Sequence, residues 1–138
     1  DNSNFQQNVS ISGNCIINDN LFINKYSLDI NNIYITNTQN IYNLSINSSL
    51  NIINIQNILN TNIYIDLNNG PYNATEIKII MHKDCNLYLN GYSVIIRNTN
   101  LYDIVGNNVN EIQFINSGNN IMLLWNVTYW QILYGNFD

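Results

Sequence analysis

The reactive residue types of this chain gather in one stretch, His82-Lys83-Asp84-Cys85. Catalysis by a Cys/His pair requires the two side chains to meet, usually from distant parts of a fold. Here they follow one another at the end of a strand-like segment, which is typical of a polar turn. With one His and two Cys in the chain, no structural zinc set can form within one subunit. Only three copies of His82 around a threefold axis would bring such ligands together. We therefore interpret the stretch as a turn and predict no metal or cofactor site.

Acidic residues offer a second chemistry, because two carboxylates can cleave a glycosidic bond. Asp66 lies on a strand-like segment before Asn69-Gly70, and Glu76 begins the next such segment, so these two are candidates to approach each other. Solvated turn positions are the better explanation of these residues, and the sequence has no Gly-rich phosphate loop and no Ser/His/Asp arrangement. We predict that the protein is not an enzyme and has no catalytic residues. The carboxylates considered are Asp66, Glu76, Asp84, Asp103 and Glu111.

Both tryptophans lie near the C-terminus, where they could form either a sugar-stacking platform or part of a core. A short connection at residues 126–129 makes this segment a hairpin in which the apolar side chains share one face. An exposed platform would place its rings among polar partners, whereas this face is continuous and apolar. We therefore predict that Trp125 and Trp130 pack in the core or in a subunit interface. The facing pairs in this register are Trp125–Trp130, Leu123–Ile132 and Ile121–Tyr134.

The segments that would position these residues are β-strands throughout. Apolar residues alternate with Asn, Ser, Asp and Gly at a period of two, and there is one Pro and little that favours a helix. In residues 1–60 the runs are short and bury too little surface to fold alone. This part therefore predicts a β-shaft or β-helical segment that packs on its next turn or on another subunit. The runs are 20–24, 32–36, 43–47 and 51–55.

Residues 61–138 contain longer strands and clearer reversals. Asn90-Gly91 is typical of a type I′ hairpin, in which Leu89 would face Tyr92 and Leu87 would face Val94. Further reversals are expected at 69–71 and at 106–110. This part predicts an antiparallel β-sandwich of the jelly-roll type. Its expected strands are 76–82, 111–115, 121–125 and 129–133.

Charge and composition limit the partners. The net charge of −5, with four Lys and Arg in 138 residues, excludes the basic surface needed for nucleic acid or anionic lipid. No stretch has the apolar length of a membrane span. A surface rich in Asn, with few titrating groups, suits exposure outside a cell. Cys15 and Cys85 could form one disulfide or remain two thiols.

The second part of the chain resembles the C-terminal tip domains of viral fibres, the trimeric β-structured heads found in phages and in large A/T-rich DNA viruses. The resemblance rests on Tyr64, Asp66 and Leu67 and on the closing pattern around Trp125 and Trp130. It implies an intertwined homotrimer at the virion surface, in which residues 1–60 form a shaft segment and 61–138 the tip. The implied role is structural, with attachment to a cell-surface glycan or protein receptor. The resemblance supplies no catalytic residues.

Two other functions fit the same sequence. One is a monomeric carbohydrate-binding β-sandwich whose Tyr residues stack on sugars. The other is a fragment of a parallel β-helix from a tailspike-type enzyme that degrades glycans. A secreted chain would also offer N-glycosylation acceptors, of which Asn126 at the hairpin tip is expected to be the most accessible. The acceptor asparagines are Asn8, Asn43, Asn47, Asn73 and Asn126.

Overall fold

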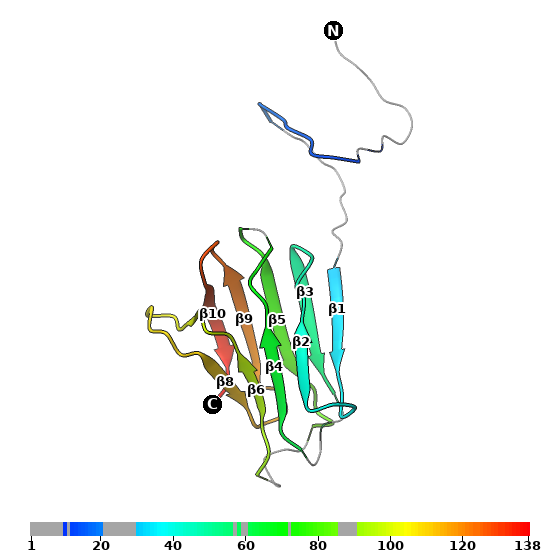
Figure 1. Cartoon of the computed structure of the whole chain (residues 1–138), viewed down its shortest axis with the longest axis vertical. Helices are drawn as coiled ribbons and strands as arrows, with labels where there is room; N and C mark the ends of the chain where they lie inside the picture. The colour runs from blue at the N-terminus through cyan, green and yellow to red at the C-terminus, as the bar shows by residue number, and fades with distance from the viewer. Residues whose placement is uncertain are drawn as a thin grey trace.

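A computed structural model describes residues 10, 12–20, 30–56, 58, 61–71, 73–85 and 91–138. The described part contains ten strands and no helix, which confirms the all-β prediction. The strands form two sheets that face each other (Figure 1). Sheet A has the order β1-β3-β5-β9-β10-β7, and sheet B has the order β2-β4-β6-β8. The bounds are β1 Ile30–Ile35, β2 Ile41–Leu44, β3 Leu50–Ile55, β4 Ile63–Leu67, β5 Glu76–Met81, β6 Val94–Arg97, β7 Leu101–Tyr102, β8 Glu111–Phe114, β9 Asn120–Trp125 and β10 Trp130–Asn136.

The first six strands form a stack of three parallel coils. Successive strands alternate between the two sheets, so that β1, β3 and β5 are parallel neighbours in sheet A. In the same way β2, β4 and β6 are parallel neighbours in sheet B. Parallel strands need a crossover between them, and here the strand of the opposite sheet provides it. Ile33, Ile53 and Ile79 consequently lie in one row across three coils.

This topology corrects the antiparallel sandwich expected for residues 61–138. The sheets are mixed, because β4 and β6 run parallel while β9 and β10 run antiparallel. Strands from both sides of residue 60 pair in the same two sheets. A period of two is compatible with either direction of pairing. Direction depends instead on whether a turn reverses within one sheet or crosses to the other.

The pairing expected for Val94 in the Asn90-Gly91 hairpin is also wrong. Val94 is the register partner of Ile63 on one side and of Phe114 on the other, so both edges of β6 are occupied. The predicted partners Leu87 and Leu89 lie outside the described residues. Asn90 lies outside the described residues, so the turn itself stays a prediction, whereas long-range pairing with β4 and β8 decides the neighbours of β6.

The C-terminal end of the stack is covered by strands that reverse direction. β9 runs antiparallel on β5, β10 runs antiparallel on β9, and β8 runs antiparallel on β6. β7 completes the outer edge of sheet A with only two residues. At the other end of the stack, β1 and β2 are the edge strands of their sheets (Figure 1).

One hydrophobic core lies between the sheets. In β3, β4 and β5 every second side chain is buried, as the alternation predicts. Isoleucine dominates because a β-branched side chain packs well on a pleated surface. Both sheets and both halves of the chain contribute. Fully buried members include Ile35, Ile53, Ile55, Ile63, Ile65, Ile77, Ile79, Ile96, Phe114 and Trp130.

Asparagine replaces isoleucine at one inward position of sheet A. Asn51 is fully buried, and its Nδ2 donates to the carbonyl oxygens of Ser48 at 2.8 Å and Glu76 at 3.2 Å. Its Oδ1 accepts from Asn31 Nδ2 at 3.0 Å, one coil earlier. Buried amides are tolerated when both ends are hydrogen-bonded. The two asparagines therefore form a short ladder that links β1, β3 and β5.

The C-terminal hairpin confirms two of its three predicted pairs. Trp130 pairs with Trp125, and their ring centroids lie 5.2 Å apart at 58°. Both indoles are buried, at 0% and 4% exposure, which confirms the core prediction over the sugar platform. The third pair is wrong, because a β-bulge between Ile132 and Tyr134 places Tyr134 opposite Met122.

Candidate ligand-binding surfaces

The stretch 82–85 forms a turn after β5, as predicted. Cys85 N donates to His82 O at 3.2 Å, and the His82 Nε2 lies 3.0 Å from Asn54 Oδ1. Cys85 is buried, with its Sγ directed to the carbonyl oxygen of Ile55 at 3.5 Å. Cys15 is exposed, and the two cysteines are not bridged. In the described part of the chain, no three His, Cys, Asp or Glu residues gather in a way that could hold a metal ion.

The expected approach of Asp66 and Glu76 is wrong. Asp66 alternates with the buried residues of β4, so it lies on the outer face of sheet B. Glu76 alternates with the buried residues of β5, so it lies on the outer face of sheet A. The two carboxylates are therefore separated by the core. Consecutive strands of a coil belong to opposite sheets, so neighbours in sequence do not share a face.

Asp66 instead pairs with Arg97, the single arginine of the chain. Arg97 donates from Nε and Nη2 to the two carboxylate oxygens, at 2.6 and 2.8 Å. The guanidinium carbon also lies 4.5 Å from the ring centroid of Tyr64. The hydrogen bonds that Arg97 donates to Asp66 raise the pKa of Arg97 above its ordinary value. The sequence analysis did not consider Arg97 as a site residue, although a single arginine in a chain with few charges pointed to it.

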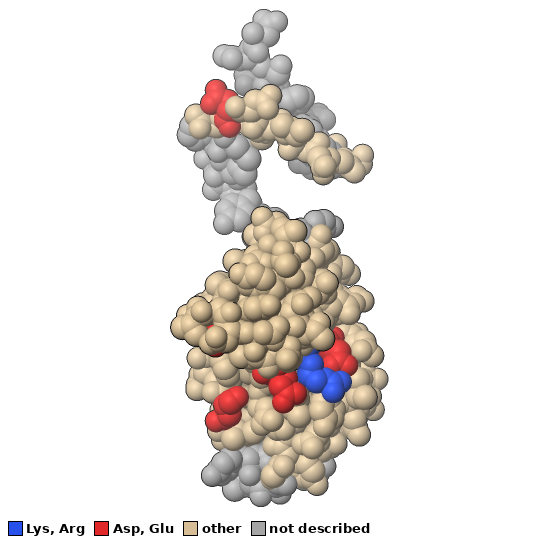
Figure 2. Space-filling model, turned by 60° about the vertical axis from the view of Figure 1, so that its left-hand side comes forward, with Lys and Arg blue, Asp and Glu red and all other residues tan. Residues whose placement is uncertain are grey.

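The ion pair lies beside a polar hollow of about 510 Å³ on the outer face of sheet B. Glu111 is the register partner of Arg97 on β8 and adds a second carboxylate. On the face drawn in Figure 2, basic and acidic residues lie side by side while most of the surface is uncharged. An exposed ion pair contributes little to stability. The hollow can accept and donate hydrogen bonds, but its cation is already neutralised. It is lined by Asp66, Leu67, Arg97, Asn98, Thr99, Asn110 and Glu111.

A second hollow, of about 270 Å³, lies on the outer face of sheet A. Its centre is one row across three adjacent strands, in which Lys78, Met122 and Tyr134 are register partners. Ile80 and Asn120 extend the lining beside this row. The hollow therefore combines one cation, one aromatic ring, an amide and aliphatic groups. Pockets that bind small molecules have this mixture.

The β-bulge of β10 places Tyr134 at this hollow. Without it, the alternation of β10 would pair Tyr134 with Ile121, an inward position. With it, Tyr134 is 56% exposed and Ile121 faces Gly135. A Cβ at Gly135 would lie 2.6 Å from the Asn120 carbonyl oxygen, so the close approach requires glycine. Gly135 was the signal for the bulge in the sequence. The facing pairs were predicted from the alternation of apolar residues alone, without this glycine.

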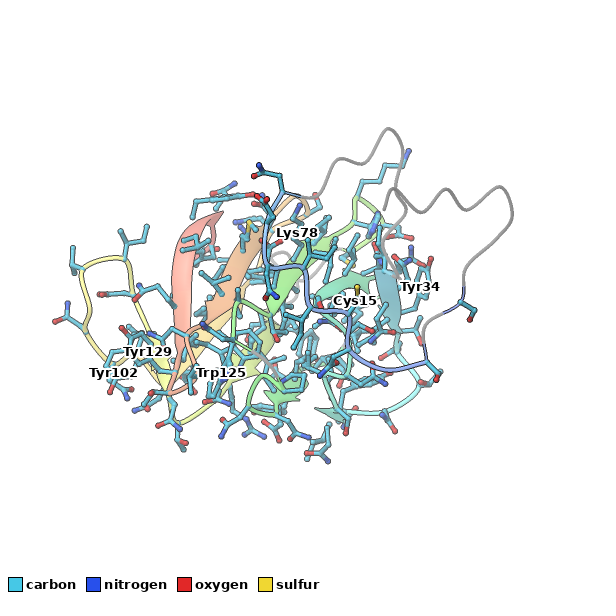
Figure 3. The ribbon with its side chains drawn as sticks, turned by 90° about the horizontal axis from the view of Figure 1, so that it is seen from above. Cys15, Tyr34, Lys78, Tyr102, Trp125 and Tyr129 are labelled. Carbon is cyan, nitrogen blue, oxygen red and sulfur yellow. The ribbon has the colours of Figure 1, made fainter. Side chains whose placement is uncertain are left out.

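Lys78 has no salt bridge to any described carboxylate. Glu76 shares the outer face but is the register partner of Leu124, two positions along the strand. Figure 3 shows Lys78 on the outer side of sheet A, away from the core position of Trp125. Its ammonium group is the one uncompensated cation that the described strands carry.

A further aromatic pair lies at the β7 edge of sheet A. The rings of Tyr102 and Tyr129 lie 4.5 Å apart at 43°, side by side in Figure 3. Gln131 Nε2 donates to the carbonyl oxygen of Asp103 next to them. Both tyrosines are half-buried. Their mutual contact covers part of each ring, so we interpret the pair as support for the short edge strand.

The asparagines of the N-glycosylation sequons are not accessible in the order expected, in which Asn126 came first. Asn126 is half-buried, and its Oδ1 accepts hydrogen bonds from the backbone N–H groups of Thr128 at 3.2 Å and Tyr129 at 3.0 Å. The hairpin turn therefore fixes the Asn126 side chain through its amide oxygen, whereas a glycan would be attached to Nδ2. Asn8 lies outside the described residues. The exposed acceptors are Asn43, Asn47 and Asn73.

Comparison with known proteins found no matching family model, curated protein or solved structure. The viral fibre resemblance therefore stays a prediction. In the described part of the chain, no helix is long and apolar enough to cross a membrane.

Proposed function

We propose that this protein is the non-enzymatic tip of a viral fibre or spike, with a structural and attachment role at the virion surface. The observation that carries the proposal is the asymmetry of the coil stack. Antiparallel strands cover its C-terminal end, whereas β1 and β2 are the edges at the other end among the strands that the structure describes. In a repeat structure of this kind one end of the stack is capped, and further coils can be added at the other end.

The two ends also differ in how their edges are protected. β7 is a two-residue strand, and short edge strands resist pairing with other chains. β1 and β2 have the sequences INNIYI and IYNL, without a charge or a proline. Unprotected edges of this kind accept further strands. A shaft coil or a neighbouring subunit covering them is what a tip on a β-structured fibre requires.

The proposal includes a homotrimer, and solution mass tests it. Light scattering is expected to give three times the chain mass of 15.9 kDa. A monomeric mass would contradict the trimeric tip and favour a monomeric carbohydrate-binding domain. Binding to a panel of immobilised cell-surface glycans then tests attachment, and a trimer that binds none of them and no receptor-bearing cell would leave a structural role only.

Edge variants test where the assembly forms. Asn32 and Ile41 are exposed on β1 and β2. Replacing both with Lys is expected to reduce the trimer to monomer, because edge lysines oppose strand addition. The control is Gln113→Lys, which places one lysine on the exposed face of the opposite edge strand, β8, and is compared with Ile41→Lys alone as well as with the double variant. Equal loss of trimer in the control and in these variants would contradict assembly through β1 and β2.

Glycan cleavage is a second candidate function, because parallel coils are the architecture expected of a tailspike-type enzyme. Asp66 and Glu111 flank Arg97 across three neighbouring strands of sheet B. Cleavage needs one protonated carboxyl group, and both oxygens of Asp66 already accept bonds from Arg97. The geometry therefore favours binding. Release of reducing ends from a glycan, abolished by Glu111→Gln, would reverse this preference.

A further inference from the structure

We infer that the hollow on the outer face of sheet A binds a carboxylated sugar, with Lys78 holding the carboxylate and Tyr134 packing against the sugar ring. This inference rests on the attachment role proposed above, and it supplies the ligand class and the site. Its geometric basis is the row formed by Lys78, Met122 and Tyr134 across β5, β9 and β10.

The first argument is the bulge. Register on β10 is regular at Trp130 and Ile132 and shifts only before Tyr134. The shift turns a large aromatic side chain out of the core, where it would otherwise bury apolar area. Bulges commonly redirect a side chain beside a functional site. An exposed tyrosine at the mouth of a hollow is the result, and stability alone does not account for it.

The second argument is charge. Arg97 already donates to both oxygens of Asp66, so its hollow has no unsatisfied cation for an anionic ligand. Lys78 has no such partner among the described carboxylates, and Ile80 and Met122 lie beside it. Apolar neighbours reduce the local dielectric and strengthen the attraction to an anion. A carboxylate is a group that one ammonium can hold in this way.

The third argument is size and polarity. A hollow of about 270 Å³ is just below the range of drug-sized pockets, which suits one sugar ring. Asn120 Nδ2 donates to Gly118 O at 2.9 Å, which leaves Asn120 Oδ1 to accept from a sugar hydroxyl. The ring of Tyr134 offers an apolar face, and its hydroxyl adds a polar group. Carboxylate, hydroxyls and an apolar ring face occur together in an acidic monosaccharide.

The experiment compares two probes that differ only at the carboxylate, methyl glucuronide and methyl glucoside. Amide shifts of the labelled full chain are followed during titration with each. The glucuronide is expected to shift residues around Lys78, Met122 and Tyr134 with an affinity of about 1 mM, and the glucoside at least about tenfold more weakly. Equal affinity for the two probes would overturn the inference, as would shifts confined to another surface.

Two variants with matched controls assign the roles. Lys78→Met is expected to lower the affinity for methyl glucuronide about tenfold, whereas Lys83→Met, at an exposed turn, leaves it unchanged. Tyr134→Ser is expected to weaken both probes, while Tyr34→Ser, at an exposed position on β1, weakens neither. Both target side chains lie on the outer face, so thermal unfolding should be close to wild type. Retained selectivity in Lys78→Met would overturn the inference.

These outcomes are separable from those of the proposed function. A monomeric mass contradicts the trimeric tip while carboxylate selectivity still supports the sugar site. A stable trimer without carboxylate selectivity contradicts the site and leaves the tip proposal standing.

Discussion

The indole Nε1 of Trp130 donates a hydrogen bond of 3.0 Å to the carbonyl oxygen of Asn68, 62 residues earlier in the chain. Trp130 belongs to β10 of sheet A, and Asn68 directly follows β4 of sheet B. A buried indole needs a partner for its N–H group. The bond therefore joins the C-terminal cover to the coil stack, across the core.

Replacing Trp130 tests this connection. Trp130→Ala is expected to lower the free energy of unfolding by about 3–5 kcal/mol, since a fully buried ring is lost. Trp130→Phe keeps most of the ring but removes the donor, and a loss of about 1–3 kcal/mol is expected. Denaturant unfolding followed by circular dichroism measures both. A Trp130→Ala protein with unchanged stability would show that the ring faces outward.

Gly70 gives a second stability prediction, because it packs directly on Trp125. A Cβ at Gly70 would lie 2.3 Å from Trp125 Cγ, whereas a Cβ at Gly13 meets nothing within 4 Å. Gly70→Ala is expected to destabilise the protein by about 1–3 kcal/mol through overpacking. Gly13→Ala is the control and should change thermal unfolding little. Similar midpoints for the two variants would contradict this packing.

The asparagine ladder predicts a polar contribution to the core. Asn51→Ala removes the amide that serves Ser48 O, Glu76 O and Asn31 Nδ2. Leaving buried groups unsatisfied is expected to cost about 1–3 kcal/mol. Asn32→Ala, at an exposed position of β1, should stay within about 0.5 kcal/mol of the parent. Chemical denaturation of the two variants makes the comparison.

Asp103 predicts a local response to acid. Hydrogen bonds from the backbone and side chain of Asn107, and then from the Val105 N–H, hold the pKa of this carboxyl below its ordinary value. A pKa lowered by folding means that the contribution is present above the unfolded pKa and lost as pH falls through the folded pKa. The amides of Val105 and Asn107 should therefore shift together in acid. Asp103→Asn should abolish that titration, and its persistence would contradict the assignment.

The two cysteines predict different thiol reactivity. Cys15 is exposed and Cys85 is 4% exposed, and no disulfide joins them. One thiol per chain should react quickly with a chromogenic disulfide reagent in native buffer, and two should react in denaturant. Cys15→Ser is expected to remove the fast reaction. Absence of any thiol in denaturant, restored by reductant, would reveal a bridge instead.

Local sequence pattern determined where the strands lie and which residues they bury. The runs 51–55 and 76–82 became β3 and β5, and their alternate residues became the core. The same pattern was enough to place Trp125 opposite Trp130 in a buried hairpin. These features follow from the pleat, which alternates side chains between two faces over a few residues.

Tertiary structure decided strand direction, sheet membership and both candidate surfaces. Side chains alternate with a period of two in both parallel and antiparallel sheets. The parallel coils form because each turn crosses to the opposite sheet. Arg97 meets Asp66 across 31 residues because β4 and β6 are neighbours in one sheet. Tyr134 lines the same hollow as Lys78 because a bulge shifts β10 by one residue against β9. Such contacts depend on pairing between distant segments, and a one-residue change of register reverses the face that a side chain occupies.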